Sequence, residues 1–353
     1  GWLCTYYVYD ELNQLRFVLS PKAVTIAYGN GWNLAADTTT INELCFRYEY
    51  DFRRRMSAKK VPGTAWTYMI YDQRDRLVYT QDGNMRARNQ WMATLYDVLN
   101  RPTTTGMISY SGTPGQLQAY VTTVTGSSST SSLTVSGVGV AALPQTLSLA
   151  TLYNGDQQAQ SEITLDNGFA TPDTVDFTAE IVTGNGSGNS FSNTVQVASN
   201  PLPAGSGFIP LTLTFYDDYS QVTDRQYTAA YNGLLDPGAN LHPETLPAVN
   251  EQQGIPTTGQ VTATRVRVIE DPADLTKGQW LTTASFYDDR LRVIQTQSDN
   301  YRGGRDTLTS RYNFPGQVIA TYLAHADPQA AVSGRTRVKT TQNFDPAGRL
   351  LDV

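Results

Sequence analysis

The sequence has 353 residues, with 32 acidic against 26 basic side chains and 21 tyrosines against 11 phenylalanines. The net charge of −6 excludes the basic excess that nucleic-acid binding needs, and no run of about 18 apolar residues indicates a membrane span. The abundance of Tyr, Thr, Ser and Gly favours a β protein over a helical one.

A short motif, an aromatic residue followed by Asp or Asn, recurs in the first and last thirds of the chain. We number positions from this aromatic residue as zero. Position five is always Gln or Arg, position six is nearly always apolar, and position four is mostly Gly, Asn or Asp, which tolerate a left-handed backbone. The copies start at Tyr9, Tyr50, Tyr71, Tyr96, Tyr216, Tyr287, Tyr312 and Phe344.

These preferences predict one β-hairpin per copy. A type I turn followed by a left-handed residue closes a three-residue hairpin loop, and Asp or Asn at position one favours that turn. Position zero then lies opposite position six, and position one lies opposite position five. Pro315 stands at position three, where a type I turn does not favour proline, so we expect a different turn there. Loop tips are expected at about Glu11–Asn13, Gln73–Asp75 and Pro346–Gly348.

We interpret the repeated residues as structural, with no catalytic, metal-binding or cofactor-binding role. One cross-strand pair contributes only about 0.2–1 kcal/mol, so the copies must stack to be stable. The residues assigned to the repeated structure are Tyr9, Asp10, Tyr50, Asp51, Tyr71, Asp72, Arg76, Tyr96, Asp97, Arg101, Tyr216, Asp217, Tyr287, Asp288, Arg292, Tyr312, Gly316, Phe344, Asp345, Gly348 and Arg349.

A second column of residues precedes the motif. Cys4 and Cys45 stand at one offset before two copies, and Trp66 and Trp91 stand at the same offset before the next two. Because Cys and Trp are usually buried, we interpret the column as buried strand residues. A Cys4–Cys45 disulfide is the alternative, if those strands pack within reach.

The repeat is interrupted over residues 113–210, where every charged side chain is acidic. Alternating apolar residues, as in Val175–Ile181, and Asn-Gly turns predict a small inserted β-sandwich. Deleting the insertion should leave the flanking strands folded. The predicted parts are a repeat segment over 1–112, the insertion over 113–210 and a second repeat segment over 211–353.

Candidate metal ligands are few. Asp166, Asp173 and Asp176 are the acidic residues that we considered for calcium, but they lack an EF-hand spacing, and a solvated acidic face is the better interpretation. His242 and His325 have no neighbouring Cys or His at a zinc spacing. We therefore predict no cofactor.

Two acidic pairs, Asp217-Asp218 and Asp288-Asp289, have the composition of a catalytic carboxylate pair. Both stand at positions one and two of the repeat, so turn formation explains them without chemistry. Sugar stacking on the Tyr and Trp rings is a further alternative, against which packing of the rings on position six is favoured.

The copies resemble the Rhs/YD-repeat family, whose consensus is Tyr-Asp, two variable residues and Gly-Arg-Leu. Residues 44–107 and 285–323 look like Rhs proteins of the Bacteroidetes type in particular. The resemblance implies a β-strand ribbon that spirals into a hollow shell, as in Rhs toxins, Tc-toxin C components and teneurins. The family's cleavage motif and aspartyl protease pair are absent from the sequence, so its catalytic residues are transferred to no position.

The resemblance implies a non-enzymatic wall segment of a secreted or cell-surface bacterial protein. Its partner would be the remainder of the same polypeptide, including an enclosed C-terminal, toxin-like domain. Secretion machinery and surface glycans are further candidate partners, whereas nucleic acid and membrane insertion are not expected. The alternative is a cell-surface adhesion or carbohydrate-binding β-scaffold. A polysaccharide-acting β-helix enzyme is a third, less favoured class.

Overall fold

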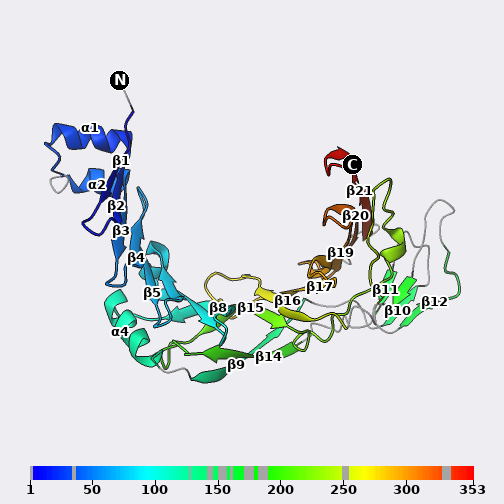
Figure 1. Cartoon of the computed structure of the whole chain (residues 1–353). Coiled ribbons are helices and arrows are strands. Elements are labelled where there is room, and N and C mark those ends of the chain that lie inside the picture. Colours follow the sequence, from blue (N-terminus) through cyan, green and yellow to red (C-terminus); the bar gives the residue numbers. More distant parts are fainter. Residues whose placement is uncertain are drawn as a thin grey trace. The chain divides into compact units, whose positions relative to one another are not determined.

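The computed structural model describes residues 3–33, 37–126, 129–140, 146–149, 157–159, 162–170, 179–181, 190–248, 254–327 and 335–353. Its main element is a 15-stranded sheet, so the all-β prediction is confirmed (Figure 1). Strands that follow one another in the chain pair antiparallel in the sheet, as β5 with β6 and β19 with β20. The strand order is β1-β2-β3-β4-β5-β6-β7-β8-β15-β16-β17-β18-β19-β20-β21.

The chain forms two compact units, Gly1–Leu133 with Val195–Leu211, and Thr134–Thr194 with Thr212–Val353. The three-part division proposed from the sequence stays a prediction. In the first unit, the strands of the sheet that lie before the insertion are β1 (Tyr6–Tyr9), β2 (Leu15–Leu19), β3 (Cys45–Tyr50), β4 (Met56–Lys60), β5 (Thr67–Tyr71), β6 (Leu77–Gln81), β7 (Gln90–Tyr96) and β8 (Pro102–Ser109).

Helices of the first unit begin at side chains that cap their free N–H groups. Thr113 and Gln116 form a reciprocal capping box at the start of α4, and proline follows Thr113 at the first helical position, where its missing N–H costs nothing. The sequence analysis did not predict these helices. They are α1 (Pro21–Gly29), α2 (Thr38–Leu44), α3 (Gly83–Ala87) and α4 (Pro114–Val124).

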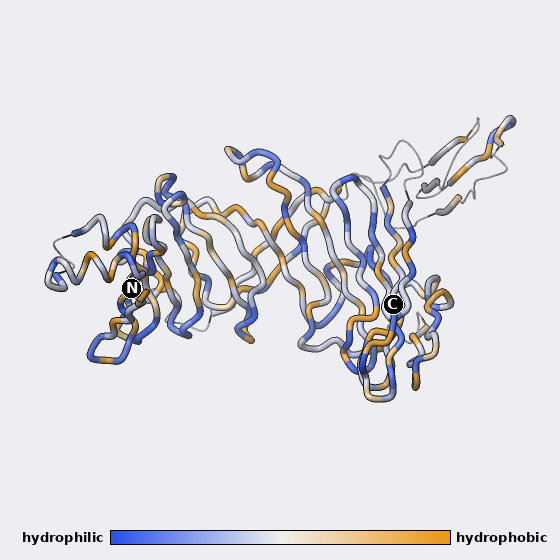
Figure 2. Tube along the Cα trace, turned by 90° about the horizontal axis from the view of Figure 1, so that it is seen from above, coloured by the Kyte–Doolittle hydropathy of each residue, from blue (hydrophilic) through white to orange (hydrophobic). Residues whose placement is uncertain are grey.

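The largest core of the first unit joins strands to α4. Strand β7 buries alternate residues, among them Trp91, and Leu117 and Val121 of α4 pack into the same cluster. The hydroxyl of Tyr79 in this cluster donates to the carbonyl of Pro201, 2.8 Å away. Alternation of hydrophilic and hydrophobic residues along the strands is visible in Figure 2. Residues from both ends of the insertion therefore belong to the core of the repeat segment.

The second unit has its own core. Trp280 and Phe286 of β17 are fully buried, the Phe191 ring meets Trp280 edge-on at 5.6 Å, and the Tyr219 ring stacks on Phe286 at 5.0 Å. Strand β15 (Ile209–Asp217) starts in the first unit and continues into the second. The elements that follow it in the second unit are the 3-10 helix η2 (Asn232–Leu234) and the strands β16 (Thr257–Arg267), β17 (Trp280–Tyr287), β18 (Val293–Asp299), β19 (Arg305–Tyr312), β20 (Val318–Ala326), β21 (Arg335–Thr341), β22 (Asn343–Phe344) and β23 (Leu350–Asp352).

Apart from α4, the regular structure described in the insertion consists of strands. Strands β9 (Thr130–Val138) and β14 (Ser190–Ala198) pair with each other, and Val195 and Val197 of β14 are buried. Beyond them, β10 pairs parallel with β12, and β11 pairs parallel with β13. The bounds of these four strands are Thr146–Leu149, Gln157–Ala159, Glu162–Leu165 and Ala179–Ile181.

The column of cysteines and tryptophans is only partly buried. Cys45 and Trp91 are fully buried, whereas Trp66 is half-buried and Cys4 is exposed. Both cysteines are free, so the alternative of a Cys4–Cys45 disulfide is wrong. Cys4 lies before Tyr6, the first residue of β1.

Some predictions fall outside the described residues. These are the alternating residues Val175 and Phe177 and the calcium candidates Asp173 and Asp176. Within the described ranges, no helix is long and apolar enough to cross a membrane.

Candidate functional site

The repeated turn has one hydrogen-bonding pattern, seen in the copy at Asp72. Its N–H donates to the Arg76 carbonyl at 3.0 Å, and its carbonyl accepts from the Asp75 N–H at 3.2 Å. One carboxylate oxygen accepts the N–H groups of Arg74 and Arg76, both at 2.9 Å, and the other accepts Arg76 Nε at 2.6 Å. Asp at position one therefore holds both the turn and the arginine opposite.

The predicted register is present in every copy except the one at Tyr216. The residue at position zero pairs with position six, as Tyr71 does with Leu77 and Tyr287 with Val293. Position four has a left-handed backbone in each of these copies, with φ between 60° and 93°. These residues are Asn13, Arg54, Asp75, Asn100, Leu291, Gly316 and Gly348.

The expectation of a different turn at Pro315 is wrong. The Asn313 N–H donates to the Gln317 carbonyl at 3.0 Å and the Gly316 N–H to the Asn313 carbonyl at 2.9 Å, as in the other copies. The Asn313 side-chain oxygen accepts only from the Gln317 N–H, at 2.8 Å, because proline at position three has no N–H to donate. Proline thus removes one bond and leaves the turn intact.

The copy at Tyr216 does not form the predicted hairpin. Tyr216 pairs with Val261 of β16, not with Val222, and Asp217 itself has the left-handed backbone, at φ 75°. Its carboxylate accepts the N–H of Gly259 at 2.6 Å. Because the left-handed residue stands at position one instead of position four, the chain turns early and leaves the sheet.

A tyrosine hydroxyl links each hairpin to the one before it. Tyr71 donates to the carbonyl of Met56 at 2.9 Å, and Tyr96 donates to the carbonyl of Leu77 at 2.9 Å. Each acceptor is position six of the preceding hairpin. The remaining bonds of this kind are Tyr50 to Leu15, Tyr312 to Val293 and, with a strand residue of β16, Tyr287 to Val261. The hydroxyl gives a reason for tyrosine at position zero in these five copies.

In three copies, arginine at position five links the hairpin to the one after it. The Arg76 guanidinium donates to the Asp97 carbonyl at 3.3 Å and lies 4.9 Å from the centre of the Tyr96 ring. Arg55 and Arg292 make the same two contacts with the next hairpin. We call these arginine and tyrosine contacts the inter-hairpin ladder.

Burial raises the pKa values of tyrosines in the inter-hairpin ladder. Burial raises the pKa of Tyr71 and of Tyr96 above its usual value, although the arginine next to each ring acts in the opposite direction. Burial likewise raises the pKa of Tyr287 and Tyr312. The four hydroxyl groups therefore stay protonated hydrogen-bond donors at physiological pH, and an arginine covers one face of the Tyr71, Tyr96 and Tyr312 rings.

The other residues considered from the sequence are not brought together into a site. Asp288 is buried in its turn while Asp289 is exposed. His242 is exposed, and His325 lies 2.7 Å from Asp306. Among the described residues, no group of three or more His, Cys, Asp or Glu side chains has the geometry of a metal site.

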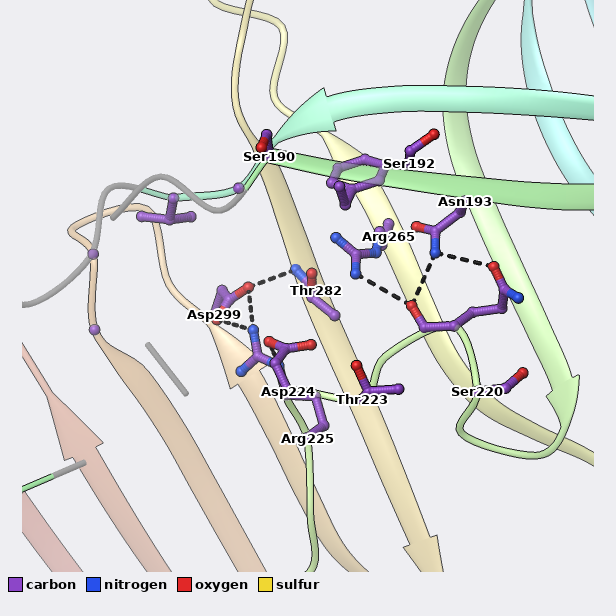
Figure 3. Close-up of a pocket in the computed structure, with 16 residues that line it drawn as sticks. Ser190, Ser192, Asn193, Ser220, Thr223, Asp224, Arg225, Arg265, Thr282 and Asp299 are labelled. Carbon is purple, nitrogen blue, oxygen red and sulfur yellow. Dashed lines mark hydrogen bonds and ion pairs between the residues drawn. The ribbon is translucent and has the colours of Figure 1, made fainter. Parts of the chain in front are cut away.

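The second unit contains a polar cavity of about 410 Å³ that the sequence analysis missed (Figure 3). Arg225 and Arg265 line it, each with only 6% of its surface exposed. They come from the loop after β15 and from β16, far apart in sequence, so only the sheet register brings them together. No local motif signals such a cluster.

Arg225 is paired on one side of this cavity. Its Nη2 donates to both carboxylate oxygens of Asp299, at 2.7 and 2.9 Å, and Asp299 also accepts the Thr282 N–H at 2.9 Å. Nε lies 3.1 Å from the Asp224 carboxylate, outside hydrogen-bonding geometry. Nη1 is buried and has no hydrogen-bond partner within the described part of the chain.

Arg265 has no ion pair among the described residues. Its guanidinium lies 4.0 Å from the centre of the Phe191 ring, and Nη2 donates to the Gln221 carbonyl at a long 3.4 Å. Burial lowers the pKa of Arg265, and burial together with the charge of Arg225 lowers the pKa of nearby Arg305 to about 10. The charged side chains that line the cavity are two arginines, Arg225 and Arg265, and two carboxylates, Asp224 and Asp299.

No family model and no curated protein matches the sequence. Among solved structures, the chain is similar to the Tc holotoxin pore of Photorhabdus luminescens, with a TM-score of 0.39 and 10% identity over 99% of this chain and 11% of that one. It is also similar to a TcdB2–TccC3 complex, with a TM-score of 0.38 and 10% identity over 98% of this chain and 12% of that one. The chain thus spans about a ninth of these proteins, and TM-scores below 0.5 do not by themselves establish a shared fold.

Proposed function

We propose that this chain is a non-enzymatic wall segment of a large Rhs/YD-repeat protein. The observation that carries the proposal is the inter-hairpin ladder. Arg76, for example, donates to its own turn through Asp72, to the next hairpin through Asp97 and to the returning insertion through the Ala198 carbonyl at 3.1 Å. Side chains that are committed to joining neighbours in this way build a continuous wall.

In this proposal the wall shields a C-terminal, toxin-like domain of the same polypeptide, and the whole protein is secreted or held at a bacterial cell surface. The enclosed domain is the expected main partner, and secretion machinery or surface glycans are secondary ones. The support for enclosure is the resemblance of the repeat to Rhs proteins. The support for a structural role is that its polar groups are used in the ladder.

The test uses the full polypeptide that contains this segment. Sequencing the gene beyond Val353 should reveal a shell-closing segment and a short C-terminal domain. Limited proteolysis should leave that domain intact in the native protein. The C-terminal domain should become cleavable in Arg76→Ala, because this variant loses buried contacts of the inter-hairpin ladder. It should stay protected in Arg349→Ala, because the native Arg349 side chain is 81% exposed.

Two results would contradict the proposal. One is a C-terminal domain that is cleaved equally fast in the native protein and when expressed alone. The other is a gene that continues through further β-modules into a surface-sorting domain, which would favour the adhesion scaffold.

A further inference from the structure

Three aromatic side chains form an exposed cluster in the first unit, apart from the inter-hairpin ladder. The rings of Tyr6 and Trp32 stack, with 5.3 Å between their centres and 8° between their planes, and the Tyr28 ring lies nearly perpendicular to Trp32 at 6.3 Å. Tyr6, Tyr28 and Trp32 are 44%, 74% and 46% exposed. Because Trp and Tyr bury most of their surface on average, three such rings in one exposed place indicate a binding surface.

Helix α1 ends in a way that leaves Trp32 outside it. The Gly31 N–H donates to the Tyr28 carbonyl at 3.1 Å, and the Trp32 N–H donates to the Ala27 carbonyl at 2.7 Å. This pair of bonds is a Schellman motif, which needs a left-handed residue only at Gly31. Trp32 nevertheless has a left-handed backbone as well, at φ 64°. Bulky residues rarely adopt this costly backbone, and it occurs preferentially at functional sites.

The first hairpin and α1 together hold the rings in place. Tyr6 pairs with Leu19 across the hairpin, so the two side chains share a face of the sheet. Leu19 forms a buried cluster with Ala23 of α1, which shows that α1 packs on this face (Figure 1). The end of α1 therefore brings Trp32 to Tyr6, and the cluster rests on two regular elements.

One face of the Trp32 ring is open. Tyr6 stacks on a single face, and Trp32 is still 46% exposed. Within the described chain, no heavy atom lies within 4 Å of the place that a Cβ atom would take at Gly29 or Gly31. A flat ligand surface can therefore approach the ring next to Tyr28.

The segments that carry the rings are polar but uncharged. Residues 1–9 and 23–36 contain no Asp, Glu, Lys or Arg. The amide side chains of Asn30 and Asn33 are exposed on either side of Trp32 in the sequence. Amides offer both donors and acceptors, so they suit a ligand with hydroxyl groups.

We propose that Tyr6, Tyr28 and Trp32, which we call the aromatic cluster, bind a neutral sugar residue of a glycan. The C–H groups on one face of a pyranose ring pack against the electron-rich face of an aromatic ring. The amides of Asn30 and Asn33 would bind the sugar hydroxyls at its edge. Because neither segment carries a charge, a neutral sugar is favoured over a uronic acid and over an acidic peptide.

The proposed function names surface glycans as a secondary partner, and this inference rests on that part of it. The wall role rests on the inter-hairpin ladder, which shares no residue with the aromatic cluster. Loss of sugar binding would therefore leave the wall role intact, and a failure of the wall role would leave the sugar site intact.

The experiment is calorimetric titration of the chain with five probes. Cellotetraose, mannotetraose and chitotetraose are the neutral glycans, and tetragalacturonate is the charged one. Decaproline tests for a peptide partner, because extended proline-rich peptides also pack on exposed aromatic rings. We expect at least one neutral tetrasaccharide to bind with a Kd of about 1 mM or lower. Tetragalacturonate and decaproline should bind more weakly than that tetrasaccharide.

Trp32→Gly separates a binding role from a structural one. It removes the ring and places glycine where the backbone is left-handed, so the melting temperature should not fall. Sugar binding should weaken at least tenfold, a loss of about 1.4 kcal/mol. Tyr28→Ala should weaken binding in the same direction. The control is Tyr7→Ala, since Tyr7 is 60% exposed on the opposite face of β1 and should not affect affinity.

Four outcomes would overturn the proposal. The first is that no neutral tetrasaccharide binds up to about 10 mM, ten times the expected Kd. The second is tighter binding of tetragalacturonate than of every neutral tetrasaccharide. Tighter binding of decaproline is the third, and it would identify a peptide-binding surface instead. The fourth is native affinity for the sugar in a folded Trp32→Gly protein.

Discussion

The guanidinium of Arg76 lies 4.9 Å from the centre of the Tyr96 ring, although the two residues belong to different hairpins. The same ring is held a second time, because its hydroxyl donates to the carbonyl of Leu77, the residue that follows Arg76. Two adjacent residues of one hairpin thus fix one side chain of the next. This arrangement makes the stability of a hairpin depend on its neighbour.

The first prediction concerns Arg76→Ala. Asp72, whose side chain is completely buried, would lose its counterion, and breaking a buried pair costs about 3–5 kcal/mol of unfolding free energy. The matched variant is Arg349→Ala, which removes the same pair from an exposed turn and should cost no more than about 1 kcal/mol. Urea unfolding of both proteins checks the difference, and equal losses would show that burial of the pair is unimportant.

The second prediction concerns the tyrosine hydroxyl. Tyr96→Phe should lower the free energy of unfolding by about 0.5–1.5 kcal/mol, because the Leu77 carbonyl loses its donor. Tyr9→Phe is the control, since Tyr9 is exposed and makes no hydrogen bond through its hydroxyl within the described chain. It should change stability by less than about 0.5 kcal/mol. A similar loss of unfolding free energy in both variants would show that the Tyr96 hydroxyl bond does not stabilise the inter-hairpin ladder.

The third prediction concerns alkaline pH. Burial raises the pKa of Tyr71, Tyr96, Tyr287 and Tyr312 above the usual value of 10.0. The folded state therefore keeps protons that the unfolded state releases, so stability is complete below pH 10 and falls as the pH rises above it. Burial lowers the pKa of Arg265, of Arg267 and of Arg305, the last to about 10, and these three groups act in the opposite sense.

The free energy of unfolding, measured by urea titration, should be constant up to about pH 10 and should then fall, by at most about 1.4 kcal/mol per pH unit for each buried tyrosine. Tyrosinate absorbance should show a set of rings that ionise only when the protein unfolds. Ionisation of all tyrosines at their ordinary pKa in the folded protein would contradict this prediction.

The fourth prediction revises the expectation that residues 113–210 can be deleted without effect. Leu117 and Val121 lie in the core with Trp91, and Phe191 covers Trp280, so this deletion should unfold the protein. Deleting only 141–189 should not, because it keeps α4 and the β9–β14 ribbon. Circular dichroism melting of both variants tests this, and equal stability of the two would show that the insertion contributes nothing to the cores.

The sequence predicted the turns well because they are local. Asp at position one and a left-handed residue at position four act within one loop, so spacing alone located them. The copy at Tyr216 failed because nothing in its spacing shows that Asp217 adopts the left-handed backbone. Long-range acceptors, such as the Met56 carbonyl for Tyr71, also cannot be found before the strand order is known.

Two features were missed for different reasons. The capping box at Thr113 and Gln116 is a local signal for the start of α4, so this helix could have been predicted from the sequence. The cavity lined by Arg225 and Arg265 could not be predicted from the sequence, because the two arginines stand on separate elements and neither lies in a local sequence motif.

The left-handed residue at position four and the ladder have a mechanical consequence. Each hairpin is closed locally by its own turn, and its ladder bonds join it to the hairpins directly before and after it. Tension applied along such a chain loads one hairpin boundary at a time, because distant hairpins share no contacts that would fail together. The array should therefore lengthen under force in a series of small, evenly sized steps, each releasing one hairpin whose turn can re-form when the load is removed.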